Sequence, residues 1–377
     1  MTSPALELAP PLDLAPRVRS LVPSDFPRPT GREEEWRFVP QGAFAQFLEP
    51  VASAGHAAPT ESTASLIPIA ELTSSWLPID LPSALARDGV SHAVVLEIPA
   101  EHESSEPIHV SLTATAPVSY EHVEIRFGRF SKATVILEQP VDAAICGSIV
   151  VTVGDGATAT VVNVSDGDRA FESMLAWHAD LGRDATFHGT QVSLGGSHLR
   201  IQPSVAYHGT GGNAQLLGVF LADDGQFMEH RLFVDHNLPN CTSNVVYKGA
   251  LSGESSHTVW VGDVLVRREA TGIETYEINR NLLLSDGARA DSVPNLELET
   301  GDIASAGHAS ATGRFDDDQL FYLQARGIDE ETARQLVVRG FFADIVSRIP
   351  DAAWQADIMG RIAARLGVPA EIEADDE

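Results

Sequence analysis

Short β-type segments follow one another from about residue 90 to residue 313, and no convincing helix interrupts them. Glycine, aspartate, asparagine or proline bounds each segment, as turn residues bound strands. Some two hundred residues of nearly pure strand are too many for most single sandwiches, so the chain is expected to form a barrel, a large sandwich or a coiled stack of strands. Representative segments are HAVVLEI, IHVSLTA, KATVILE, GSIVVTV, ATATVVNV, TFHGTQVSL, AQLLGVFL and HTVWVGDVLV.

A weak internal repeat favours the coiled stack. A glycine, a short gap and then small and β-branched residues recur, and the glycines lie 26, 28 and 29 residues apart. Such spacing is typical of successive rungs of a parallel β-helix, in which like residues stack on like. The four copies are GRFSKATVI (128–136), GDGATATVV (154–162), GRDATFHGT (182–190) and GGNAQLLGV (211–219).

The two ends of the chain have a different texture. Residues 1–85 are rich in proline, alanine and serine, with one helix-like patch at 33–48. Residues 314–377 have helical periodicity. We therefore predict an N-terminal, partly helical region at 1–85, a β-helix core at 86–313 and a C-terminal helical region at 314–377.

The C-terminal region contains signals for three helices. Asp316 can cap the first helix, with Gln319 completing a capping box. Asp329 can cap the second helix, and the third is the amphipathic segment 354–367.

Charge and cysteine content exclude several classes of function. The net charge is −28, from 53 acidic and 25 basic residues, and such a surface repels nucleic-acid phosphates and anionic lipid. The longest apolar run (216–222) is far shorter than a membrane span, and no secretory signal is visible. These features predict a cytoplasmic protein. Cys146 and Cys241 are the only cysteines, so neither a disulfide framework nor a cysteine-built metal site is expected from this chain alone.

Histidines and carboxylates offer candidates for chemistry. Four histidines at intervals of ten residues could meet only if the chain folds back, and scattered positions are the favoured interpretation (His178, His188, His198 and His208). The segment EHRLFVDHN (229–237) lacks metalloprotease spacing and is assigned a structural role. A polysaccharide-degrading β-helix enzyme would need paired carboxylates, but nothing in the sequence pairs those present, and a solvated face is favoured (Asp235, Glu254, Asp263, Glu274 and Glu277).

His308 has an unusual setting among glycine, alanine and serine at 304–312. Small neighbours leave its imidazole uncovered by its own strand, so another surface could approach closely. Neutral imidazole is a ligand for iron or zinc when a partner chain brings further groups. The alternative is an ordinary exposed or hydrogen-bonded histidine.

The segment 274–346 resembles the C-terminal part of the SufB/SufD family of iron–sulfur cluster assembly proteins. The matching elements are NRNLLLSDGA, the P-x-L-E-L strand, a histidine followed by small residues, and the LFYLxxRGI and GFF helices. Segments 194–221 and 236–251 also fit, and EEEWRF (33–38) resembles the family's N-terminal element. Within the family the sequence is closer to the SufD branch than to the SufB branch, because it is short for SufB and poor in cysteine.

The resemblance implies a right-handed parallel β-helix flanked by N-terminal and C-terminal helical regions. It implies a non-catalytic scaffold subunit that pairs with SufB, carries the ATPase SufC on its C-terminal helices and has a role in iron supply. No tightly bound cofactor is implied, only transient iron or an iron–sulfur cluster at the SufB interface. His308 matches the family histidine at that interface. Many relatives have a cysteine two positions earlier, where this chain has Ala306, so His308 is the sole candidate metal ligand from this chain at that spot.

The helices at 316–326 and 329–342 match the SufC-docking region of the family. The candidate docking residues are Phe321, Tyr322, Arg326 and Phe341, with core packing as the competing explanation for the aromatic ones. Two rival functions are a SufB-like scaffold that associates with itself and a β-helix carbohydrate-active enzyme. Without its partner the chain is also a candidate homodimer.

Overall fold

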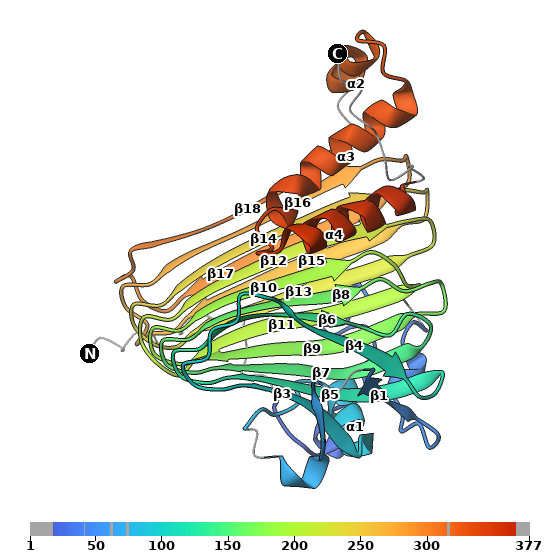
Figure 1. Ribbon diagram of the computed structural model, residues 1–377. Helices are drawn as coiled ribbons and strands as arrows, with labels where there is room; N and C mark the ends of the chain where they lie inside the picture. Colours follow the sequence, from blue (N-terminus) through green and yellow to red (C-terminus); the bar gives the residue numbers. More distant parts are fainter. Residues whose placement is uncertain (1–17, 41, 61–62, 73–74, 315–316, 367–377) are drawn as a thin grey trace, which may run out of the picture.

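The computed structural model describes residues 18–40, 42–60, 63–72, 75–314 and 317–366. Its body is a right-handed parallel β-solenoid of about eight turns. Strands β3 to β18 alternate between two parallel sheets, so each turn contributes one strand to each sheet (Figure 1). The mainly β fold and the β-helix predicted from the sequence are confirmed.

The odd-numbered strands form one sheet and the even-numbered strands the other. The odd sheet contains β3 (His92–Ile98), β5 (Val118–Phe127), β7 (Ala144–Val153), β9 (Glu172–Leu181), β11 (His198–Tyr207), β13 (Phe227–His236), β15 (His257–Val266) and β17 (Arg289–Leu298). The even sheet contains β4 (Ile108–Ala114), β6 (Lys132–Glu138), β8 (Thr158–Ser165), β10 (Thr186–Ser193), β12 (Asn213–Ala222), β14 (Thr242–Leu251), β16 (Glu274–Leu283) and β18 (Ser305–Arg314). Two short strands, β1 (Gly55–Pro59) and β2 (Ser65–Pro68), pair antiparallel with β4 and β3.

The strand register follows the glycine repeat. Lys132 pairs with Thr158, Thr158 with Thr186, and Thr186 with Asn213, so equivalent positions of successive rungs stack directly. Each of the four repeat copies therefore turns into one strand of the even sheet. Stacking like on like explains why β-branched residues recur at these positions.

Alternate side chains of every strand point into the solenoid and form a continuous core. This core includes Val135, Val161 and Phe187, which are at most 1% exposed. Polar side chains in the middle rungs satisfy one another: Gln139 Nε2 donates to Asn163 Oδ1 at 3.0 Å, and Asn163 Nδ2 donates to Gln191 Oε1 at 2.8 Å. Such a ladder keeps buried amides hydrogen-bonded across three rungs.

The N-terminal region covers the outer face of the odd sheet. The helix predicted at 33–48 is wrong: the described residues there form turns and the 3₁₀-helix η2 (Ala45–Phe47), because Pro40 and Gly42, at φ 87°, interrupt an α-helix. Trp36 instead lies under the buried Arg200 guanidinium, 4.5 Å from its ring centre. Further along are the 3₁₀-helices η1 (Pro23–Asp25) and η3 (Ile69–Glu71) and the helix α1 (Leu81–Gly89), which contacts β5, β7 and β9.

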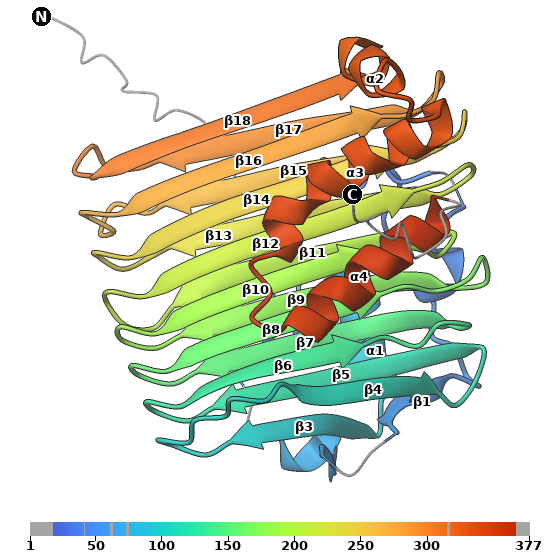
Figure 2. The ribbon, with the colours of Figure 1, turned by 45° about the horizontal axis from the view of Figure 1, so that its top comes forward.

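The C-terminal helices lie on the opposite side, over the even sheet (Figure 2). They are α2 (Asp317–Gln324), α3 (Glu330–Val346) and α4 (Ala352–Arg365). The Asp329 cap is confirmed, because its carboxylate accepts a hydrogen bond from the Thr332 amide at 3.0 Å. The predicted Asp316 cap lies outside the described residues. None of the described helices is long and apolar enough to cross a membrane.

Buried contacts fix α3 and α4 to the sheet. Phe342, Ile345 and Ile358 join one apolar cluster with side chains from the outer face of the even strands. Lys248 on β14 donates to the Phe341 carbonyl at 2.8 Å and to Asp344 Oδ1 at 2.5 Å. Helix α2 differs, since it projects beyond the last rung next to the end of β18 (Figure 1).

Candidate functional site

The interior of the solenoid turns from apolar to polar at its C-terminal end. On β14 the inward positions include Val245 and Tyr247, which belong to the core. In register above them, β16 places Glu277 and Asn279, and Asn281 follows two residues later. The next rung, β18, places His308, Ser310 and Thr312 directly above these three. The last two even strands thus line the end of the solenoid with polar groups.

His308 and Glu277 face each other across adjacent rungs. Their Nδ1 and Oε1 atoms lie 3.8 Å apart, and the side chains are 42% and 1% exposed. This separation exceeds hydrogen-bond distance. Neither carboxylate oxygen of Glu277 has a hydrogen-bond partner among the described residues. The pair therefore combines an accessible imidazole with a buried, unsatisfied carboxyl group.

The surroundings of Glu277 favour its protonated form. Burial is the main cause that raises the pKa of Glu277 to about 9; the charge of Asp263 adds to it, and the Asn295 backbone amide opposes it. Its carboxyl group fills the space over Gly262 on β15, where a Cβ atom would lie 2.2 Å from Oε2 and could not fit. A polar group without partners at a buried position costs stability, and functional sites are where proteins retain such groups.

Two asparagines continue the polar lining beside the pair. Asn281 Nδ2 donates to Asn279 Oδ1 at 2.7 Å and approaches Thr312 Oγ1 at 3.2 Å. Asn279 in turn donates to the Tyr247 carbonyl at 3.3 Å. Both asparagines belong to the NRNLLLSDGA motif, which therefore specifies the interior of the penultimate even rung.

The last rung leaves strand edges available. β17 pairs with β15 and β18 with β16, and within the described residues no strand pairs with their outer edges. The large apolar side chains Tyr276 and Leu298 are exposed nearby. An open edge of this kind is a template for pairing with another strand.

The four predicted docking residues divide into two groups. Phe321 and Tyr322 are 72% and 55% exposed, and the Arg326 guanidinium lies 4.6 Å from the Tyr322 ring centre. Phe341 instead packs against the apolar cluster under α3, with Lys248 4.9 Å from its ring centre. The first three form an exposed aromatic and cationic surface on α2 and the turn after it, and Phe341 lies apart from them.

The evenly spaced histidines do not form a common site. His178 and His208 both contact Asp180 Oδ1, at 3.0 and 2.7 Å, whereas His188 contacts Gln215 and His198 contacts Glu172. Among the described residues no group of three or more histidine, cysteine or acidic side chains could hold a metal ion. His230 and His236 are buried in the solenoid, where burial lowers their pKa values to about 3 and about 4.

The expectation of a solvated carboxylate face is wrong for three of the five residues. Asp235, Asp263 and Glu277 are buried, whereas Glu254 and Glu274 are exposed. Asp235 is held by the Arg267 guanidinium at 2.7 and 2.9 Å, and Asp263 accepts a hydrogen bond from Asn295. Glu277 alone among the three lacks such a partner, and it is the one next to His308.

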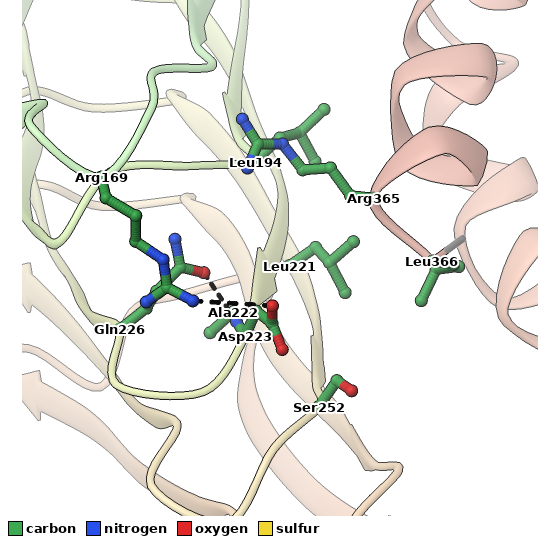
Figure 3. A pocket seen from close by; sticks show the side chains of 9 residues that line it. All are labelled: Arg169, Leu194, Leu221, Ala222, Asp223, Gln226, Ser252, Arg365 and Leu366. Atoms are coloured by element: carbon green, nitrogen blue, oxygen red, sulfur yellow. Dashed lines mark hydrogen bonds and ion pairs between the residues drawn. The ribbon is translucent and has the colours of Figure 1, made fainter. Parts of the chain in front are cut away.

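A pocket also lies between the strand-end loops and the end of α4 (Figure 3). Its two arginines are already paired, Arg365 with Asp166 at 2.5 Å and Arg169 with Asp223 at 3.6 Å. Paired guanidinium groups leave little charge for a ligand. The pocket therefore ranks below the open end of the solenoid as a functional site.

Comparison with known proteins identifies the family. The model of the SUF system FeS cluster assembly SufBD core domain matches residues 110–341. The chain belongs to the SufBD family. A SufBD family protein of Mycobacterium tuberculosis is 43% identical over 340 residues, covering 86% of each chain. The iron–sulfur cluster assembly protein SufD of Escherichia coli is 25% identical over 385 residues, covering 90% of this chain and 89% of its own length.

Membership of the SufBD family places the chain in iron–sulfur cluster assembly. The sequence identified His308 but missed Glu277, Asn279 and Asn281 as its neighbours. A signal was present, since Thr275, Glu277, Asn279 and Asn281 are polar at alternate positions of one strand. The register that stacks them under the His308 rung, however, needed the solved strand pairing.

Proposed function

We propose that the chain is a non-catalytic scaffold subunit of a SufBCD-type complex. In this complex it pairs with a SufB-type paralogue, docks the ATPase SufC and takes part in iron supply to the nascent cluster. The observation that carries the proposal is the open, polar end of the solenoid, where His308 lies beside unpaired strand edges. SufBD family membership supports the same role.

The pairing surface is the last rung. A partner solenoid that adds its own edge strands to β17 and β18 would satisfy their backbone groups. It would also cover Tyr276 and Leu298 and bring its ligands close to His308, whose neighbours Ala306 and Ala309 are small. Iron at this seam is cargo in transit, not a resident cofactor of this chain.

The docking surface for the ATPase is the exposed group Phe321, Tyr322 and Arg326. Aromatic and arginine side chains contribute most to protein interfaces, and here they lie on a helix next to the last rung. ATP-driven movement of a docked subunit would then act directly on the seam between two rigid solenoids.

The cysteines weigh against the rival of a self-sufficient SufB-like scaffold. Cys146 and Cys241 are both buried, and burial raises the pKa of each thiol. Neither residue belongs to the last two rungs that form the open end. Pairing of two identical chains through the same edges remains the expected association when the partner is absent.

Co-purification tests the proposal. The tagged chain, expressed together with its native neighbours, is expected to bring down a β-helix paralogue and an ABC-type ATPase in defined stoichiometry. His308→Ala is expected to leave the complex assembled while cluster formation falls. Recovery of neither partner, or unchanged cluster yield in this variant, would reject the proposed role.

A further inference from the structure

The carboxyl group of Glu277 has no structural explanation within the described residues. Its oxygens accept no hydrogen bond, its side chain is 1% exposed, and nothing but Gly262 makes room for it. A glutamine or leucine at this position would fill the same space without a buried acid. The stacking of rungs nevertheless places Glu277 directly under His308.

The spacing of the two side chains fits a shared ion. An ion about 2.1 Å from an imidazole nitrogen and a carboxylate oxygen, at a tetrahedral angle, holds these atoms about 3.4 Å apart. The observed 3.8 Å between His308 Nδ1 and Glu277 Oε1 differs from this by a few tenths of an ångström. One nitrogen and one carboxylate oxygen form a donor set suited to divalent iron and related ions.

We infer that Glu277 and His308 together form a half site for a divalent transition-metal ion, with the remaining ligands coming from the partner across the last rung. This inference rests on the proposed function and adds a second ligand from this chain. His308 supplies the accessible ligand, and Glu277 supplies a negative charge from inside the solenoid. The open rung lets the ion enter from the partner side.

The half site also accounts for the absence of a cysteine at 306. A neutral imidazole alone gives no charge neutralisation to a divalent cation, and Ala306 offers no ligand. A carboxylate from the rung below supplies the missing charge without a thiol. Asn279 and Asn281 keep the adjacent interior polar, so the ion does not enter an apolar core.

Metal titration of matched variants tests the inference. The complex and the single chain are titrated anaerobically with Fe(II) by equilibrium dialysis and with Co(II) by visible absorption. His308→Ala and Glu277→Gln are each expected to weaken binding at least about tenfold, and Glu277→Asp to retain part of it. His257→Gln is the matched control, because His257 lies 2.7 Å from Asp291 in another half-buried histidine–carboxylate pair.

Each outcome decides the question. Near-UV circular dichroism and thermal unfolding establish that every variant is folded, and Glu277→Asp replaces Glu277→Gln if the latter is not. Unchanged metal binding by the Glu277 variant overturns the inference, and so does an equal loss in His257→Gln. Because co-purification is scored separately, loss of Glu277 as a ligand leaves the scaffold proposal standing. Failure of the complex to assemble rejects the scaffold, while titration of the single chain still tests the half site.

Discussion

The middle and the last rungs of the solenoid have the same backbone but different interiors. In the middle rungs, around β8 to β12, apolar side chains fill the core and the amides of Asn163 and Gln191 are hydrogen-bonded. In the last rungs the interior is polar and partly exposed, and Glu277 is left without hydrogen bonds. The middle rungs therefore carry the stability, whereas the last rungs give up stability for a reactive, accessible interior.

The largest difference should appear on removal of core volume. Phe187→Ala in the middle is expected to lower the free energy of unfolding by about 4 kcal/mol, because it leaves a cavity in a sealed core. Leu296→Ala, at a half-buried position of β17, is expected to cost about 1 kcal/mol, since solvent or the surrounding chain can fill the space. Urea unfolding measures both. Equal losses would refute the division into stable and open rungs.

Buried and exposed ion pairs give the second comparison. Arg200→Met is expected to destabilise the fold by about 3 kcal/mol, because it leaves the Glu229 carboxylate buried without its partner. The matched change is Arg314→Met on β18, where Arg314 and Asp286 are 73% and 91% exposed. It is expected to change stability by less than about 0.5 kcal/mol. A large effect of the Arg314 variant would mean that the last rung is more tightly built than its exposure indicates.

The pH dependence of stability provides a third test. The pKa of His230 is lowered to about 3 by burial, against an ordinary value of 6.5. Below pH 6.5 the unfolded chain therefore binds a proton that the folded chain does not. His230 alone is expected to remove about 2 kcal/mol of stability between pH 7 and pH 5.

His230→Gln should abolish that part of the acid loss, as unfolding at a series of pH values would measure. Leu296→Ala, destabilised for a different reason, is the control and should keep the wild-type pH dependence. A His230 variant as acid-sensitive as the wild type would contradict the assignment of a neutral, buried imidazole. His236, with a pKa lowered to about 4, contributes a separate acid loss that this variant retains.

The sequence predicted the solenoid because stacking leaves a regular trace in it. Glycines at near-constant spacing and short β-branched runs report each rung, and three of the segments read from the sequence, at 92–98, 132–138 and 257–266, coincide with β3, β6 and β15. The segment at 33–48 misled because its tryptophan and phenylalanines suggest a helix, whereas their burial depends on the distant Arg200 and the odd sheet.

The site was predictable only in part, for a related reason. His308 stands out in the sequence because its neighbours are small. Glu277 does not stand out among 53 acidic residues, and its meaning depends on a register of 31 residues between β16 and β18. Rung length varies along the chain, so one sequence does not reveal which residues stack.

The smallest effect on stability is expected at the exposed surface of α2. Phe321→Ala and Tyr322→Ala remove side chains that are 72% and 55% exposed, so each should change the free energy of unfolding by less than about 0.5 kcal/mol. If these rings dock the ATPase, the double variant should lose co-purification of that subunit while the paralogue stays bound. Phe342→Ala is the matched control, since Phe342 is fully buried under α3 and should lower stability through lost packing. An ATPase that binds the double variant as it binds the wild type would move the docking surface away from α2, and the last rung would then have to transmit ATP-driven motion by another contact.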